Sequence, residues 1–365
     1  MRYVCNTNAC CGCNACISIC PKNAIELVDN IENLNAQIDQ EKCINCGLCE
    51  KICPNVCRPL VREPILWKQG WAREEVRKNS SSGGAATAIM IAFIREGGYV
   101  ASCLYETGQF KFRIINSLNK VYAFAGSKYV KSDPGSVYGE IKKLLVKKEK
   151  VLFIGLPCQC AAVQNVCAGY NNLYTVDLIC HGTPSFSLLD SFIKENHLKW
   201  EEIKSIRFRD KHIFGLIINN RRLAPKGVTD SYLMTYLEGV DYTENCYSCM
   251  YASLKRVSDI SLGDAWGQLS DREWRGVSLI LCQTKKGETL LGKTELHLED
   301  VDIGVAKNKN QQLLRPSIMH PRRARFLKVI CNGGSFRHAA TAALPLTCLK
   351  QSVKTALINL HIWKY

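Results

Sequence analysis

The residues of this sequence that are best suited to chemistry are the cysteines of its first 57 positions. Eleven of the 21 cysteines lie there, and eight of them form two copies of the pattern C-x2-C-x2-C-x3-C-P. This run is typical of proteins that hold two cubane iron–sulfur clusters. The spacing therefore predicts two 4Fe–4S clusters and a role in moving electrons.

The two copies are expected to exchange one ligand each. Three cysteines at intervals of three line a tight loop around one cluster, whereas the proline after the fourth turns the chain toward the other cluster. The prolines are Pro21 and Pro54. One predicted ligand set is Cys10, Cys13, Cys16 and Cys53, and the other is Cys43, Cys46, Cys49 and Cys20. Three cysteines are in excess, and we interpret them as packing near the clusters: Cys5, Cys11 and Cys57.

A disulfide framework and a zinc site are the alternatives for these cysteines. No apolar run of the signal-peptide type precedes Cys5, so we expect a cytoplasmic protein. Thiols stay reduced in that compartment, which disfavours disulfides. Zinc sites use paired C-x2-C units rather than a triple run followed by proline. Iron–sulfur clusters remain the favoured interpretation.

A second group of cysteines lies in turn-like segments later in the chain. Its members are Cys158, Cys180, Cys246 and Cys249. Four thiolates from loops suit a third cubane cluster or a tetrahedral zinc ion. The alternative is that the first two are buried structural cysteines and the C-x2-C pair is a lone turn. Spacing alone leaves these interpretations open.

Three polar segments are candidates for binding another ligand. The serines and glycines of 80–84 precede an apolar helical run, and free amides at a helix start can bind phosphate. Most such serines are simple N-caps, so the signal is weak alone. Residues 126–129, Gly-Ser-Lys-Tyr, are equally ambiguous. His181 is a candidate acid, a ligand or a loop residue.

The secondary-structure elements that we expect around these residues indicate an α+β fold with several parts. We expect a two-cluster ferredoxin domain over 1–60, a linker over 61–78, an α/β part over 79–189, and a C-terminal part over 190–365. Strand 151–155, helix 161–168 and strand 173–179 form a β-α-β unit, whose strands should be parallel. Cys158 and Cys180 follow the two strand ends, where ligands bind in open α/β sheets.

The charge of the chain is concentrated near its C-terminus. The formal net charge is +15, and 11 Lys and Arg but no acidic residue follow Asp302. We interpret the predicted helix over 344–365 as a solvated basic helix that covers the last domain. A membrane-surface or partner-docking tail is the alternative. Nucleic acid is not expected, because interleaved aromatic residues for base stacking are few.

Several motifs, taken in order, resemble the coenzyme F420 hydrogenase/dehydrogenase beta-subunit family. They are Ser81-Ser82-Gly83-Gly84, Gly126-Ser127-Lys128-Tyr129-Val130, Gly155-x-Pro157-Cys158-Gln159, Asp177-x2-Cys180-x-Gly182-x-Pro184-Ser185, Cys246-x2-Cys249 and Gly263-Asp264-x-Trp266-Gly267. The family includes chlorophyll-pathway reductases, among them 7-hydroxymethyl chlorophyll a reductase, and bacterial relatives encoded beside surface-polysaccharide genes. The likeness runs from about residue 1 to at least 270. Leu156 departs from the threonine common before Pro-Cys-Gln, and the run after Asp302 matches nothing, so substrate specificity is open.

The resemblance implies a flavoprotein that carries FAD beside three 4Fe–4S clusters. The implied flavin contacts are Ser81, Ser82, Gly83, Gly84, Gly126, Ser127, Lys128 and Tyr129. The implied catalytic residues are Lys128, placed near the flavin ring edge, and His181. The implied ligands of a third, flavin-proximal cluster are Cys158, Cys180, Cys246 and Cys249.

These expectations combine into an iron–sulfur flavoprotein oxidoreductase. Electrons would pass between a ferredoxin or another low-potential donor and an organic small-molecule substrate, with surface-polysaccharide metabolism as one setting. The alternative is a non-catalytic electron-transfer subunit that relays electrons to a partner enzyme. The sequence does not identify the substrate, the direction of flow or the use of coenzyme F420.

Overall fold

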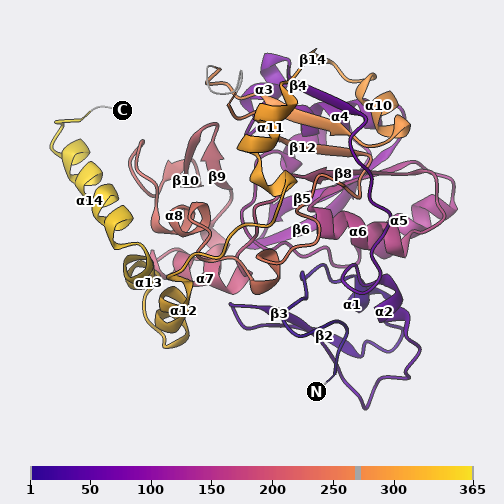
Figure 1. The fold of residues 1–365 in the computed structure, drawn as a ribbon, viewed down its shortest axis with the longest axis horizontal. Helices are drawn as coiled ribbons and strands as arrows, with labels where there is room; N and C mark the ends of the chain where they lie inside the picture. The colour runs from indigo at the N-terminus through magenta and orange to yellow at the C-terminus, as the bar shows by residue number, and fades with distance from the viewer. Residues whose placement is uncertain (1, 268–272, 364–365) are drawn as a thin grey trace.

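The computed structural model describes residues 2–267 and 273–363 (Figure 1). Its N-terminal unit is shaped by cysteine-bearing turns beside a three-stranded antiparallel sheet of order β1-β3-β2. Each of its two helices starts within a cysteine run, after a left-handed residue: Asn14 at φ 58° and Gly47 at φ 70°. The elements are β1 (Arg2–Tyr3), α1 (Ala15–Ile19), β2 (Ile25–Asp29), β3 (Leu34–Ile38) and α2 (Leu48–Ile52).

The main body is built on an eight-stranded mixed sheet of order β14-β4-β13-β12-β8-β7-β5-β6. The four central strands, β12, β8, β7 and β5, run parallel to one another, and the flanking pairs are antiparallel. The predicted parallel β-α-β unit is thus present as β7, α6 and β8. The strands are β4 (Leu66–Ala72), β5 (Tyr99–Glu106), β6 (Gln109–Ile115), β7 (Val151–Gly155), β8 (Leu173–Leu178), β12 (Ile260–Asp264), β13 (Ser278–Cys282) and β14 (Leu296–Glu299).

Both faces of this sheet are covered, because its central strands are apolar on both sides. Leu152 and Ile154 of β7 pack on the side of α4 and α10, whereas Phe153 packs on the side of α5 and α6. Ala15 and Ile52 of the N-terminal unit belong to the same hydrophobic core as Phe153, so this unit docks beside α5 and α6 (Figure 1). The helices are α3 (Glu74–Lys78), α4 (Ala85–Arg95), α5 (Val137–Val146), α6 (Pro157–Val166) and α10 (Lys285–Leu291), with a 3-10 turn over Leu118–Phe124.

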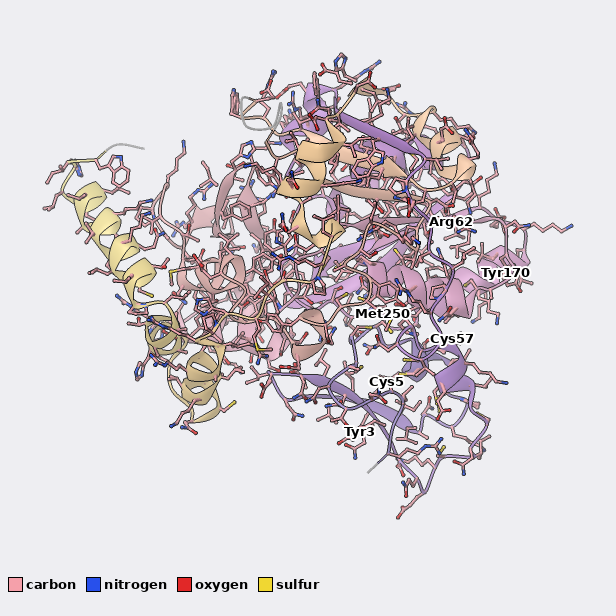
Figure 2. All side chains as sticks on the ribbon, in the orientation of Figure 1. Tyr3, Cys5, Cys57, Arg62, Tyr170 and Met250 are labelled. Atoms are coloured by element: carbon pink, nitrogen blue, oxygen red, sulfur yellow. The ribbon has the colours of Figure 1, made fainter. Side chains whose placement is uncertain are left out.

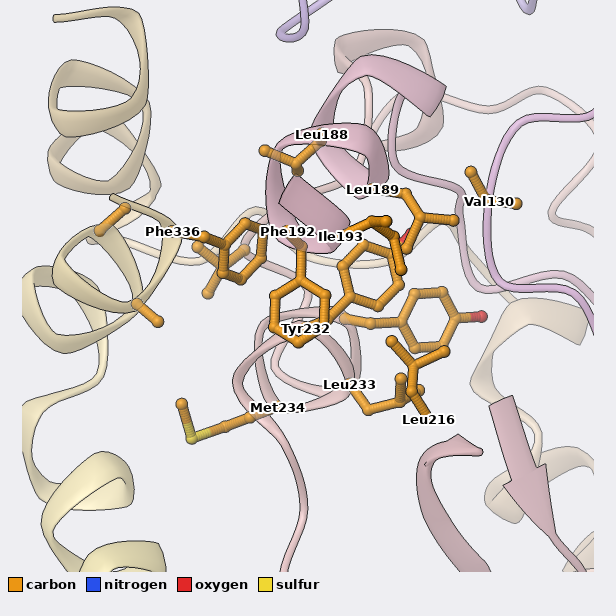
Figure 3. Close-up of a cluster of buried hydrophobic side chains, with 14 of the residues drawn as sticks. Val130, Leu188, Leu189, Phe192, Ile193, Leu216, Tyr232, Leu233, Met234 and Phe336 are labelled. Carbon is orange, nitrogen blue, oxygen red and sulfur yellow. The ribbon is translucent and has the colours of Figure 1, made fainter. Parts of the chain in front are cut away.

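A further hydrophobic core, rich in aromatic side chains, lies mainly among the elements that follow β8. Figure 3 shows Phe192 of α7, Tyr232 of α8 and Phe336 of α13 meeting there, and the Phe192 and Phe336 ring centroids are 5.2 Å apart. The elements of this part are α7 (Phe186–Glu195), β9 (Ile206–Asp210), β10 (Ile213–Ile218), β11 (Arg221–Arg222), α8 (Ser231–Leu237), α11 (Ile303–Lys309), α12 (Arg323–Cys331), α13 (Phe336–Ala343) and α14 (Pro345–Asn359).

Two predicted boundaries differ from the structure. The linker expected over 61–78 contains α3 and β4, and β4 pairs with β13 and β14 inside the main sheet. The division at 189 and 190 does not separate domains either, because β12, β13 and β14 complete the sheet that β5 to β8 begin. The ferredoxin-like unit followed by a large mixed-sheet domain is confirmed.

The C-terminal helix is largely solvated, as expected, and covers the body with half-buried residues only. α14 is helical as predicted, but none of its 15 residues is buried. α13 covers the aromatic core instead, through Phe336, Ala339, Ala340 and Ala343. Within the part of the chain that the structure describes, no helix is long and apolar enough to cross a membrane.

Candidate functional site

The eight ferredoxin-type cysteines line two small cavities. The two runs exchange one cysteine each, since Cys53 joins the first set and Cys20 joins the second. The first cavity is lined by Cys10, Cys13, Cys16 and Cys53. The second cavity is lined by Cys20, Cys43, Cys46 and Cys49. Across residues 2–267 and 273–363, no three His, Cys, Asp or Glu side chains could hold a single metal ion.

The two sets differ in their access to solvent. All four cysteines of the first set are buried, whereas Cys46 of the second set is exposed and its other members are half-buried. We call the first the inner set and the second the outer set. A partner that exchanges electrons through the surface would therefore reach the outer set first.

Two of the excess cysteines touch the inner set. The Cys5 thiol interacts with Cys10 and Cys53, and this interaction lowers the pKa of Cys10 to about 6 and that of Cys53 to about 7. Cys11 is buried, and its thiol interacts with Cys13 on one side and with Cys158 on the other. Cys11 thus joins the inner set to the later cysteines. Figure 2 shows Cys5 and Met250, which line one groove between the two parts of the molecule.

The later cysteines converge from three loops. Cys158 opens α6, Cys180 follows β8, and Cys246 and Cys249 share one turn. Their proximity shows in the pKa of Cys180, which burial raises and which Cys246, Cys158 and Cys249 raise further. We call these four residues the third set.

A half-buried lysine that sequence reasoning missed lies against the third set. Lys131 Nζ donates to the Cys11 carbonyl at 3.1 Å and to Cys246 Sγ at 3.9 Å. Burial alone would lower the pKa of Lys131, but the surrounding cysteines, Cys246 foremost, raise it overall. A fixed positive charge therefore lies beside a group of thiols. The neighbouring Cys246–Cys249 pattern was the only sequence signal, and it does not point to position 131.

A buried ion pair holds the loops of the third set together. Arg256 donates to Asp177 Oδ1 at 2.6 and 3.1 Å, and its side chain and that of Asp177 are 1% and 0% exposed. The same guanidinium donates to the carbonyls of Tyr251 and Leu178, both at 3.0 Å. Arg256 thus fixes the segment after Cys249 to the end of the strand that leads to Cys180.

A cavity of about 310 Å³, lined by residues of many elements, adjoins the third set, and Cys180 is part of its wall. This volume lies at the lower end of the roughly 300–1,000 Å³ that is usual for small-molecule pockets. The predicted site residues in its wall are Ser81, Ser82, Gly84, Gly126, Ser127, Lys128, Tyr129, Cys180 and His181.

The two predicted ligand-binding loops meet at this cavity. Ser127 N donates to Ser81 Oγ at 2.8 Å, although the residues are 46 positions apart. Gly84 caps α4 in a left-handed conformation without a side-chain cap, so the first amides of α4 are available to a ligand. Gly83 lies behind the wall, where a Cβ would be 2.5 Å from the Gly70 carbonyl oxygen and 2.6 Å from Ser278 N.

The ammonium group of Lys128 is hydrogen-bonded to backbone carbonyls of its own loop. Lys128 Nζ donates to the carbonyl oxygens of Phe124 at 2.6 Å, Ala125 at 3.2 Å and Gly126 at 3.0 Å. Burial lowers its pKa. All three hydrogens are thereby engaged, so Lys128 shapes the 124–129 loop and can offer its charge, rather than a free donor, to the cavity.

The remaining charged groups of the wall are an ion pair and a histidine. Arg209 Nη1 and Nη2 each donate to a carboxylate oxygen of Asp264 at 2.9 Å, and Nη2 also donates to the Ser81 carbonyl at 2.7 Å. The pKa of His181 is lowered, chiefly by desolvation in the cavity wall. Arg209 was missed because it lies in a strand with no motif around it, 55 residues before Asp264.

Comparisons with known proteins agree with this arrangement. Residues 148–302 match the family described as the C terminus of the coenzyme F420 hydrogenase/dehydrogenase beta subunit, and residues 9–57 match the 4Fe-4S dicluster domain. An uncharacterized protein of Methanocaldococcus jannaschii is 23% identical over 326 residues, which cover 78% of this chain and 86% of that protein.

The fold is also found among solved structures. A chain of the F420-reducing [NiFe] hydrogenase complex from Methanosarcina barkeri aligns with a TM-score of 0.50 and 19% identity, over 69% of this chain and 90% of that one. This likeness concerns the fold. The two matched domains identify an iron–sulfur electron-transfer protein that is related to the coenzyme F420 hydrogenase/dehydrogenase beta subunit.

Proposed function

We propose that this protein is an iron–sulfur flavoprotein oxidoreductase that acts on an organic small molecule. The main support for this proposal is that three cysteine sets and one cavity lie in series. The outer set reaches solvent through Cys46, Cys11 joins the inner set to the third set, and Cys180 belongs both to the third set and to the cavity wall. Such a series suits electron exchange between a surface donor, such as a ferredoxin, and a bound cofactor.

The donor chemistry of the third set fits another 4Fe–4S cluster. Four thiols from three segments lie close enough to affect one another electrostatically, and iron–sulfur clusters are held by cysteine thiolates. Lys131 offsets part of the negative charge that four thiolates would gather in a buried place. Cys158, Cys180, Cys246 and Cys249 would hold this cluster.

The polar end and the aromatic wall of the cavity offer groups that suit FAD. The open amides of α4 and the hydroxyl of Ser81 suit a pyrophosphate. Tyr129, whose ring stacks on Tyr236 with centroids 4.4 Å apart, offers a flat surface. When bound, a flavin supplies exchange of hydride or two electrons with an organic partner, and clusters supply single electrons. The ring of His181, in the cavity wall, could then accept a substrate proton.

Metal and flavin analysis of anaerobically purified protein tests this proposal. We expect about 8 to 12 iron atoms and one flavin per chain, on the basis of two or three cubane clusters. Fewer than about 8 iron atoms after full reconstitution would contradict the two ferredoxin-type clusters. Iron without flavin, after supply of FAD during reconstitution, would contradict the flavoprotein assignment.

A relay subunit is the second candidate, since the solved relative is part of a complex. The two candidates differ in what the isolated chain can do. An enzyme should reduce or oxidise a small organic acceptor with a chemical reductant or oxidant alone. A relay subunit should exchange electrons with its clusters but turn over an organic substrate only after a partner is added.

Replacement of Lys131 by methionine is expected to lower the midpoint potential of one cluster by on the order of 100 mV. A unit charge a few ångström away contributes about 2–4 kcal/mol at an effective dielectric constant of about 20, and a nearby positive charge favours the reduced cluster. Redox titration followed by electron paramagnetic resonance measures this shift. Lys131→Arg should keep most of the potential. An unchanged potential in Lys131→Met would show that this lysine does not face a cluster.

A further inference from the structure

Helix α14 carries an apolar face that points away from the protein. Leu346, Leu349, Val353 and Leu360 are 79%, 61%, 50% and 68% exposed. Their spacing of three, four and seven residues places them in one stripe along the helix. The helix projects at the edge of the molecule, drawn in yellow in Figure 1.

The opposite face of α14 is the one that contacts the body. Gln351 Oε1 accepts a hydrogen bond from Thr229 N at 3.3 Å, and Thr355 and Ile358, on the same side of the helix, are half-buried. The buried Leu344 and the α13 residues before it fix the start of the helix. The apolar stripe is therefore held outward by contacts on the other side, and it cannot fold inward while these contacts persist.

The charged residues beside the apolar stripe indicate what kind of surface the stripe binds. Helix α14 has two lysines, Lys350 and Lys354, and no acidic residue. Lys350 flanks the stripe, and Lys354 Nζ lies 5.4 Å from the ring centroid of Trp363, beyond the helix end. A second copy of α14 would bring like charges together, whereas an anionic surface complements them. Amphipathic helices with lysines beside an apolar face and a tryptophan near one end bind at the bilayer interface.

We propose that α14 is an interfacial anchor that binds an anionic lipid surface. The helix would lie in the membrane plane with its leucine and valine stripe among the acyl chains and its lysines toward the head groups. Its 15 residues give a length of about 22 Å. This role is separate from the redox chemistry and would hold the protein at a membrane without a span.

Vesicle flotation of the full-length, cluster-loaded protein tests the anchor. The wild type should float with vesicles of equal parts phosphatidylcholine and phosphatidylglycerol, and much less with phosphatidylcholine alone. The variant Leu349→Ser, Val353→Ser, Leu360→Ser should lower partitioning by at least about 100-fold, because three large apolar side chains no longer enter the lipid. Lys350→Glu should lower it about five-fold or more, and only with anionic vesicles.

A matched control and an oligomer measurement separate the other outcomes. Ser352→Ala with Asn359→Ala changes exposed polar positions of the same helix and should leave flotation unchanged. All variants should keep the wild-type iron content, which shows that the body is folded. Absence of wild-type flotation, or flotation of the triple variant at the wild-type level, overturns the proposal. A wild-type dimer that the triple variant makes monomeric, with no flotation in either, would assign the stripe to a second copy.

Discussion

Simultaneous replacement of Cys246 and Cys249 by alanine is expected to remove about four iron atoms per chain and to leave the two ferredoxin-type clusters in place. The two cysteines share one turn and supply half of the third set, and a cubane cluster cannot be retained on two of its four cysteine ligands. The inner and outer sets have no ligand in this turn. Iron analysis with electron paramagnetic resonance of the reduced protein measures the loss.

The result has a matched control in the same chain. Cys331 is exposed at the end of α12 and far in sequence from every ligand set, so Cys331→Ala with Cys348→Ala should leave the iron content unchanged. If the Cys246→Ala, Cys249→Ala variant keeps its full iron content, there is no cluster at the third set. If it loses all iron, the loss reflects misfolding of the chain and not removal of a single cluster.

Replacement of Ala86 by tryptophan is expected to abolish flavin binding, from about one flavin per chain to nearly none, with iron content unchanged. Ala86 is the second residue of α4 and lines the cavity beside the open amides. An indole there would occupy the space proposed for the pyrophosphate. Flavin absorbance after reconstitution with FAD, compared with iron in the same sample, measures the effect.

A tryptophan at the other end of the same helix is the control. Arg95 is half exposed and its ion pair with Glu295 spans 2.7 Å. A surface pair of this kind contributes about 0–1 kcal/mol, so Arg95→Trp should retain both flavin and iron. Stoichiometric flavin in Ala86→Trp would mean that the flavin binds outside this cavity.

The parts of the fold that sequence predicts well are those whose causes are local. Residues 85–95 form the predicted helix after 80–84, because an apolar run follows a serine- and glycine-rich start. Strand β4 was missed because its partners are more than 200 residues later and its own pattern mixes polar and apolar residues. Gly70 of β4 allows the His297 carbonyl oxygen to approach to 2.2 Å from where a Cβ would be. A glycine in the sequence does not by itself predict such a close contact.

The candidate site divides in the same way. The crossed ligand sets follow from spacing within two short runs. The roles of Lys128 and Lys131 do not, although the two lysines are three residues apart. The first is satisfied by carbonyls of its own loop, and the second contacts Cys246, 115 residues later in the chain. Only the folded chain decides which lysine meets the cysteines.

The pair formed by Arg256 and Asp177 restricts how this protein can diverge. Both side chains are out of reach of water, and either one alone would be a buried charge without compensation, at a cost of about 3–5 kcal/mol. That is a large share of the roughly 5–15 kcal/mol that stabilises a typical folded protein. A substitution at one of these positions is therefore strongly destabilising unless the other position changes too. Among homologues the two positions should vary together, as a charged pair or as a pair of apolar residues, and rarely one at a time.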